Sequence, residues 1–90
     1  ARYGGEEFAM ILPQADAAAA RQAAERINAA VRAMEIPHED AVPYSNVTIS
    51  VGHATVIPHA GSNPIELICE ADRALYCAKH AGRDRIIGAE

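Results

Sequence analysis

Two adjacent glycines near the start of the chain, Gly4 and Gly5, most constrain what this sequence can fold into. A Gly-Gly pair readily adopts the positive φ angles that a two-residue hairpin turn requires. The apolar run that follows at 8–12, Phe-Ala-Met-Ile-Leu, indicates a largely buried strand leaving that turn. We therefore expect Glu6 and Glu7 to lie at the edge of a sheet.

Glu6 and Glu7 allow two interpretations of this hairpin. Glycines remove side-chain bulk where a ligand must approach the backbone, and carboxylate oxygens suit Mg²⁺ and the phosphates that accompany it. These features favour a site for a metal and a nucleotide. The alternative is an ordinary hairpin with two solvated acids, and this short motif does not decide between the two.

Composition bounds the fold and excludes some functions. A chain of 90 residues, half of them hydrophobic, forms at most one small domain or a piece of one. Eight Lys plus Arg against twelve Asp plus Glu give a net charge of −4, which argues against a nucleic-acid partner because polyanions are bound by clustered positive charge. No apolar stretch approaches the roughly 20 residues of a membrane-spanning helix, so we expect no direct membrane contact from this segment.

The two cysteines indicate a reducing environment. Cys69 and Cys77 fall in one expected helix, separated by about 12 Å of helical rise. Disulfide-bonded cysteines have Cα atoms within about 7 Å, so we expect two free thiols and a cytoplasmic location.

Two helices are expected. Asp16 precedes the first, whose apolar positions recur at helical spacing: Ala20, Ala23, Ala24, Ile27, Ala30, Val31 and Met34. Asn63 can cap the second, with Pro64 at its first position and Glu66 completing a capping-box pattern. Its buried stripe comprises Leu67, Ile68, Ala71, Ala74, Leu75 and Ala78, and Gly82 is a natural stop.

Strands are expected at 8–12, at 46–57 and at 85–87, which gives the order β-α-β-α-β with helices packed on a sheet. His53 lies among the apolar positions of the long strand, and we interpret it as a hydrogen-bonded or partly exposed histidine. Only Ala1, Arg2 and Tyr3 precede the Gly-Gly turn, too few for the first strand of a hairpin. We therefore expect residues 1–90 to be the C-terminal part of one larger domain.

Three stretches in order resemble the GGDEF domain, in its GGEEF variant: 2–8 (RYGGEEF), 47–52 (VTISVG) and 71–83 (ADRALYCAKHAGR). GGDEF domains of bacterial diguanylate cyclases condense two GTP into cyclic di-GMP and release pyrophosphate in second-messenger signalling. The resemblance covers nearly the whole chain. It implies an α+β, nucleotidyl cyclase-like and ferredoxin-like domain with a central, mainly antiparallel sheet.

The resemblance also implies site residues. Glu6 matches the family's metal-binding carboxylate and proposed base, with Mg²⁺, or Mn²⁺ in its place, as cofactor, and Glu7 is a second catalytic acid. Gly4 and Gly5 match the backbone that lies along the substrate. Lys79 and Arg83 match a phosphate-holding pair, although the same two residues could simply complement the dipole at a helix end.

Other positions carry further implications. Arg26 matches an arginine of an inhibitory cyclic di-GMP site in some members. Asp72 and Tyr76 match family positions, and we expect Tyr76 to have a helix-packing role. Asp84 stands where the family usually has Asn, and its negative charge is expected to weaken nearby phosphate contacts.

The resemblance finally bears on what the segment can do. The family's other metal-binding aspartate and its guanine-reading residues have no counterpart in these 90 residues, so we expect the isolated segment to be inactive. The complete enzyme is expected to work as a cytoplasmic homodimer in which each domain presents one GTP, and it can be membrane-anchored through upstream segments. The alternative function is a non-catalytic GGDEF-like regulatory module that binds GTP or cyclic di-GMP.

Overall fold

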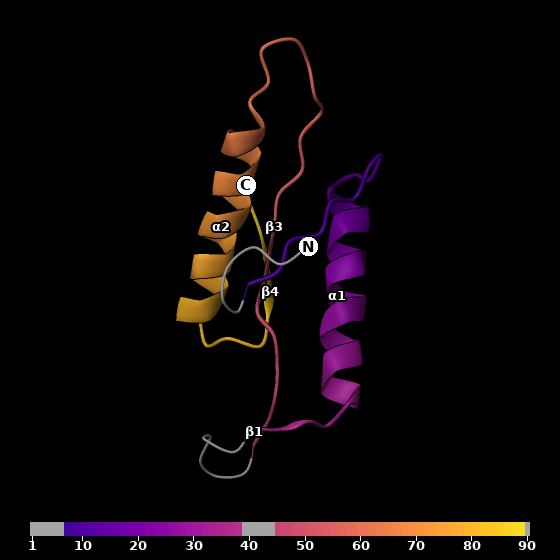
Figure 1. Ribbon diagram of the computed structural model, residues 1–90, viewed down its shortest axis with the longest axis vertical. Helices are drawn as coiled ribbons and strands as arrows, with labels where there is room; N and C mark the ends of the chain where they lie inside the picture. The colour runs from indigo at the N-terminus through magenta and orange to yellow at the C-terminus, as the bar shows by residue number, and fades with distance from the viewer. Residues whose placement is uncertain (1–6, 39–44, 90) are drawn as a thin grey trace.

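The described part of the chain contains two long helices and four short strands (Figure 1). The computed structural model describes residues 7–38 and 45–89. The elements follow one another as α1 (Ala17–Ala33), β1 (Pro37–His38), β2 (Ser45–Asn46), β3 (Val51–His53), α2 (Pro64–His80) and β4 (Ile86–Gly88). Strands β3 and β4 run between the two helices in this view, and both contact α1 as well as α2.

Helix α1 begins as expected at Asp16, whose carboxylate accepts a 2.8 Å hydrogen bond from the backbone N–H of Ala19. The buried stripe differs from the expected one. Ala20 and Ala24 are buried, but the third buried residue is Asn28, while Met34 is exposed. The face of α1 that points inward therefore includes the polar side chain of Asn28, which forms hydrogen bonds to other parts of the chain.

Helix α2 has the expected ends. The Asn63 side chain accepts a 2.9 Å hydrogen bond from Ile65 N–H, and Pro64 opens the helix. Ala74 and Ala78 are buried, whereas Ile68, expected in the stripe, is exposed. The chain leaves the helix through Gly82, whose φ of +127° is accessible because glycine has no Cβ.

The pairing of the strands differs from the expected antiparallel sheet. Among the described residues, β3 pairs with β4 in parallel, with Val51 opposite Ile86, and only the short β1 and β2 pair antiparallel. Helix α2 connects β3 to β4 and returns the chain to the same end, which makes a parallel pair the natural result. The mainly antiparallel sheet is thus not confirmed.

The expected strand at 8–12 is also not formed. Phe8 makes an isolated bridge, and 9–12 have no regular structure. The side chains of Phe8, Met10 and Ile11 are exposed, so this apolar run lacks the packed sheet face that normally stabilises such a strand. The long strand expected at 46–57 is likewise reduced to β2 and β3.

Helix α2 packs with its backbone directly on β3. A Cβ atom added at Gly52 would overlap the backbone of α2 at Ala71 and Leu75. The absence of a side chain at Gly52 therefore sets the distance between helix and strand. This close contact fixes α2, and with it the residues that α2 carries.

The core of the described region is made of small side chains: the buried hydrophobic residues are Ala20, Ala24, Ala74 and Ala78. No helix in this region is long and apolar enough to cross a membrane.

Candidate functional site

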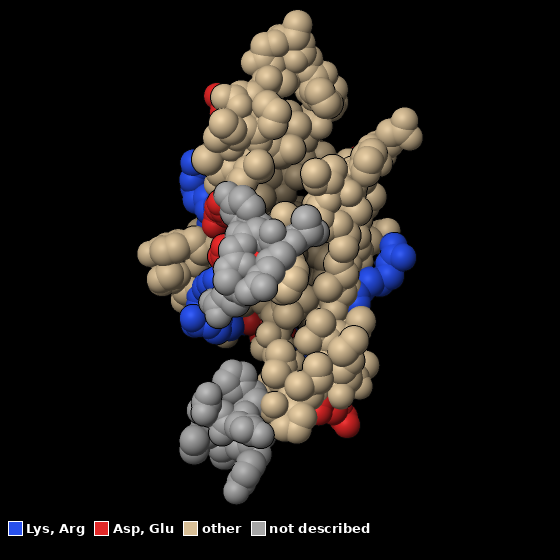
Figure 2. Space-filling model, in the orientation of Figure 1, with Lys and Arg blue, Asp and Glu red and all other residues tan. Residues whose placement is uncertain are grey.

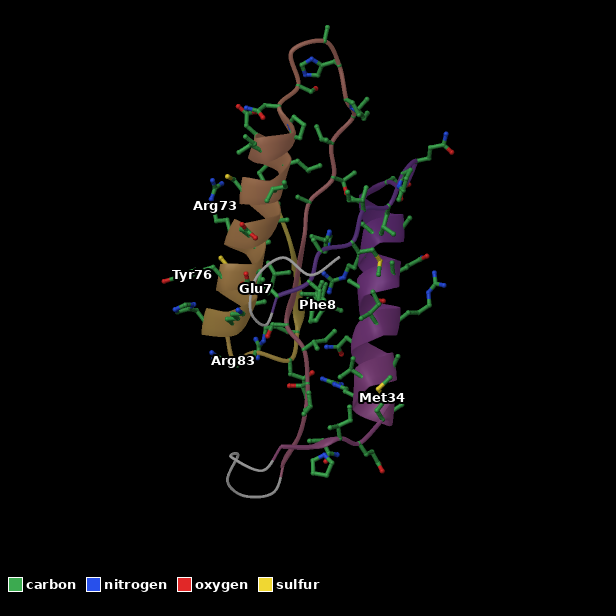
Figure 3. The ribbon with its side chains drawn as sticks, in the orientation of Figure 1. Glu7, Phe8, Met34, Arg73, Tyr76 and Arg83 are labelled. Atoms are coloured by element: carbon green, nitrogen blue, oxygen red, sulfur yellow. The ribbon has the colours of Figure 1, made fainter. Side chains whose placement is uncertain are left out.

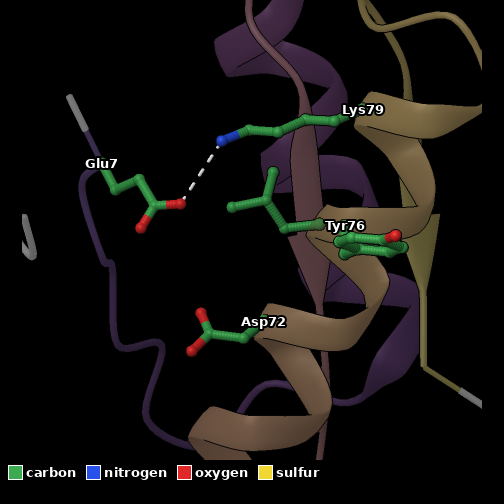
Figure 4. Close-up of a pocket in the computed structure, with 5 residues that line it drawn as sticks. Glu7, Asp72, Tyr76 and Lys79 are labelled. Atoms are coloured by element: carbon green, nitrogen blue, oxygen red, sulfur yellow. Dashed lines mark hydrogen bonds and ion pairs between the residues drawn. The ribbon is translucent and has the colours of Figure 1, made fainter.

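A pocket of about 210 Å³ lies beside the second half of α2 (Figure 4). Its lining comes from two distant parts of the chain: Glu7, and the α2 residues Asp72, Leu75, Tyr76 and Lys79. The α2 residues recur at helical spacing and therefore share one face. Two carboxylates and one ammonium group thus line the pocket together with the side chains of Leu75 and Tyr76.

Glu7 and Lys79 meet across this pocket. Lys79 Nζ donates a hydrogen bond of 3.3 Å to Glu7 Oε1. The Lys79 side chain remains 31% exposed and that of Glu7 38% exposed, so solvent weakens the ion pair and leaves both groups accessible to a ligand. The structure thus brings together two residues that the sequence assigned to one site.

Tyr76 lies at the rim of the pocket. Its side chain is exposed, and its ring stacks on His80 with the ring centroids 3.8 Å apart. The expected helix-packing role of Tyr76 is not supported, because its side chain is 62% exposed. In Figure 3 the Tyr76 side chain points outward from α2.

Arg83 lies just beyond the C-terminal end of α2 (Figure 3). Its side chain is exposed and is not among those that line the pocket. The backbone N–H of Arg83 donates a 2.9 Å hydrogen bond to Ala78 O, which closes the helix end through Gly82. Lys79 and Arg83 therefore belong to one basic helix end, with only Lys79 at the pocket.

The remaining predicted site residues are Gly4, Gly5, Glu6 and Arg26. Gly4, Gly5 and Glu6 lie outside the described residues. Arg26 is exposed on α1, and its role at an inhibitory site stays a prediction.

A polar cluster that was not predicted from the sequence joins α1 to the turn after α2. Arg32 Nε and Nη2 donate hydrogen bonds of 3.0 and 2.6 Å to the two carboxylate oxygens of Asp84. The Asn28 amide donates to Asp84 Oδ1 at 3.3 Å and to Ile49 O at 3.0 Å. The available signal was the spacing of Asn28, which continues the Ala20 and Ala24 series by one helical turn.

This cluster alters the expectation for Asp84. The hydrogen bond from Arg32 is the main cause that lowers the pKa of Asp84, and Asn28 adds to it. The carboxylate is therefore ionised and paired with a guanidinium. The sequence alone suggested that the negative charge of Asp84 weakens nearby phosphate contacts. In the structure that charge is opposed by the guanidinium of Arg32.

His53 on β3 is partly buried against Gly88 of β4. Among the described residues its Nε2 is buried without a hydrogen-bond partner, so the interpretation as a hydrogen-bonded histidine is not supported at that atom. Burial lowers the pKa of His53, with a smaller contribution from the positive charge of Arg21.

Charged groups of both signs gather over α2 on the face shown in Figure 2. Lys79 and the acids Glu7 and Asp72 contribute to this mixture at the pocket. Opposite charges side by side suit a ligand that carries both phosphate groups and a bound cation.

A comparison with protein families decides the affiliation of the chain. The sequence model described as "Diguanylate cyclase, GGDEF domain" matches residues 1–85. The chain belongs to the GGDEF family. The resemblance carried by the hairpin motif and by the end of α2 is thereby confirmed.

Relatives from several bacteria agree with this affiliation. The chain is 44% identical over 87 residues to diguanylate cyclase DgcP of Pseudomonas aeruginosa, and the match covers 96% of this chain and 12% of DgcP. It is 39% identical to probable diguanylate cyclase DgcT of Escherichia coli and 38% identical to response regulator PleD of Caulobacter vibrioides, covering 97% of this chain and 19% of each relative. The chain thus spans less than a fifth of the length of these relatives.

GGDEF domains are nucleotidyl cyclase-like and generally use divalent metal ions. The described residues fit part of such a site, since Glu7 and Asp72 offer hard oxygen ligands at the pocket. The described region holds no group of three or more residues suited to a metal. Glu6, the predicted ligand, lies outside the described residues, so further ligands must come from there, from nucleotide phosphates or from water.

Proposed function

We propose that this GGDEF segment belongs to a diguanylate cyclase that condenses two GTP into cyclic di-GMP and releases two pyrophosphates. The observation that carries the proposal is the meeting of Glu7 with Lys79 at the α2 pocket. This contact joins the acidic end of the GGEEF motif to the basic end of α2, and each alone has a simpler explanation. The family match and the names of the relatives support the same function.

The proposed reaction is a nucleotidyl transfer. The 3′-hydroxyl of one GTP attacks the α-phosphorus of the other, a new P–O bond forms, and the bond to the leaving pyrophosphate breaks. A second, equivalent step closes the ring. Negative charge spreads over the phosphate oxygens, so positioning and nearby cations account for most of the rate enhancement.

The residues of this segment take complementary parts in the proposal. The Lys79 ammonium binds a phosphate oxygen, and the Arg83 guanidinium binds another with its planar set of donors. Glu7 holds Lys79 over the pocket in the absence of nucleotide. Gly4 and Gly5 leave room for the substrate backbone, and Glu6 takes the proton of the attacking hydroxyl and is the proposed ligand for Mg²⁺ or Mn²⁺.

The remaining assignments concern the complete protein. We propose a homodimer in which two domains face one another, each with one GTP, located in the cytoplasm. We also propose that these residues contribute the order β-α-β-α-β to the C-terminal part of a ferredoxin-like domain whose central sheet is mainly antiparallel.

The test is GTP turnover by the full-length gene product with Mg²⁺, read as cyclic di-GMP formed. Glu6→Gln should abolish product, because a neutral amide is a poor base and a poor metal ligand. Lys79→Ala should raise KM for GTP about tenfold or more, the loss expected for one charge-assisted hydrogen bond.

Arg73→Ala is the matched control for Lys79→Ala. It also removes an exposed cation from α2, but Arg73 points outward from the helix (Figure 3) and is not among the residues that line the pocket. The control should keep wild-type kinetics. Nucleotide binding without product under activating conditions would instead support the regulatory module. The absence of both nucleotide binding and product would overturn the proposal.

A further inference from the structure

The turn after α2 has an unusual backbone. Gly82, Arg83 and Asp84 follow one another with positive φ angles of 127°, 61° and 45°. Side chains with a Cβ atom disfavour this left-handed region, and Asn and Asp are the residues that tolerate it best. The backbone at position 84 therefore suits Asn as well as Asp.

Asp84 differs from Asn chiefly by its charge. Consecutive Cα atoms lie about 3.8 Å apart, so the backbone of Asp84 directly follows that of Arg83, the proposed phosphate contact. An unpaired negative charge there would repel a polyphosphate. Arg32 supplies the opposite charge through hydrogen bonds to both carboxylate oxygens.

The position of Asp84 does not depend on Arg32 alone. Asn28 is buried, and its amide donates both to Asp84 and to Ile49 in the segment before β3. Arg85 Nε donates a 3.0 Å hydrogen bond to Arg83 O within the turn. These contacts keep the carboxylate in place, so loss of Arg32 would leave its charge exposed beside Arg83.

We propose that Arg32 is a positioning residue which acts through Asp84: it cancels the negative charge beside Arg83 and so keeps the basic end of α2 able to bind polyphosphate. The inference rests on the proposed function for the identity of that polyphosphate, GTP. An ordinary surface ion pair of little consequence is the competing explanation. The two explanations differ in what happens when both charges are removed together.

The test uses the full-length gene product with wild-type sequence, Arg32→Ala, Asp84→Asn and the double variant. Arg32→Ala should raise KM for GTP about fivefold with kcat nearly unchanged, the size expected for one uncompensated charge near a phosphate. Asp84→Asn should stay within about twofold of wild type. The double variant should recover most of the loss, because it removes the charge that Arg32 had opposed.

Arg21→Ala is the matched control. Arg21 is also on α1, its side chain is 51% exposed against 55% for Arg32, and its ion-pair partner is Glu25 on the same helix. This control should leave KM unchanged. Added salt should shrink the Arg32→Ala effect, since it screens exposed charges, and a purely structural loss would not respond in this way.

A double variant as impaired as Arg32→Ala, or an Arg32→Ala protein with wild-type KM, would overturn the inference while leaving the cyclase assignment intact. Calorimetric binding of inorganic pyrophosphate separates the two proposals further. If the wild type forms no cyclic di-GMP but its pyrophosphate affinity follows the same pattern across the variants, the inference stands and the cyclase assignment falls. Absence of pyrophosphate binding by wild type would overturn the inference as well.

Discussion

Polar residues in the interior show how individual positions depend on partners far away in the sequence. Asn28 is buried because its amide finds Ile49 O and Asp84, and a buried amide without partners would be destabilising. Neither partner is close to it in sequence. Helical periodicity predicted the apolar face of α1 but could not assign a polar residue to it.

His53 leads to a prediction about pH. The pKa of His53 is lower in the folded chain than in the unfolded chain, where it is near 6.5. Between these two pKa values His53 is more protonated in the unfolded chain than in the folded chain. The free energy of unfolding should therefore fall as pH is lowered through about 6.5. His53→Gln, which cannot ionise, should remove this part of the pH dependence, as measured by urea unfolding of the full-length protein at pH 7.5 and 5.5.

His59→Gln provides the control, since His59 is an exposed histidine in the loop before α2. The ionisation of Asp84 contributes in a separate, more acidic interval, where stability is lost as the carboxylate becomes protonated. Identical pH profiles for wild type and His53→Gln would contradict the prediction.

Whole elements were predictable where their signals are local. Asp16, Asn63, Pro64 and Gly82 mark helix ends through hydrogen bonds or φ values that involve only near neighbours. Strands depend on partners from elsewhere in the chain, so the run at 8–12 read as a strand without forming one. The parallel pairing of β3 with β4 likewise follows from the path of α2 and not from either strand's composition.

The contact between α2 and β3 yields a prediction for Gly52→Ala. The added methyl group would overlap the α2 backbone at Ala71 and Leu75, which cannot move without displacing the helix. We expect a loss of about 3 kcal/mol in the free energy of unfolding, the upper part of the usual range for overpacking.

Gly61→Ala is the comparison for that experiment. A Cβ at Gly61 meets nothing within 4 Å, but its φ of +96° disfavours alanine, so we expect a loss of about 1 kcal/mol. Denaturant unfolding of both variants separates overpacking from backbone strain. Equal losses would show that the helix yields to the extra methyl group.

At the scale of the whole molecule, the sequence predicted the family and two of the residues that line the pocket. Glu7 and Lys79 were assigned to one site by their motifs, and the structure joins them. The Arg32 and Asp84 pair was not predictable in this way, because the residues lie 52 positions apart and belong to no common pattern. Periodicity carries information about faces of one element, and not about which faces meet.

The 90-residue segment by itself should form no cyclic di-GMP from GTP and Mg²⁺. The described residues lack a group of three metal-capable side chains, and the proposed reaction requires two domains that each present a nucleotide. Chromatographic detection of cyclic di-GMP, with the full-length protein as positive control, is the measurement. Product from the purified segment would refute this expectation and would show that a complete active site assembles from these residues.

The contact between Glu7 and Lys79 spans 72 positions of the chain, and this separation has a consequence for biosynthesis. A ribosome releases Glu7 well before it adds Lys79, and β3 must wait for β4 before it can pair. Because such distant contacts form slowly and late, the pocket beside α2 should be among the last features to mature on the nascent chain. Until then, the exposed apolar residues at 8–12 are available to chaperones.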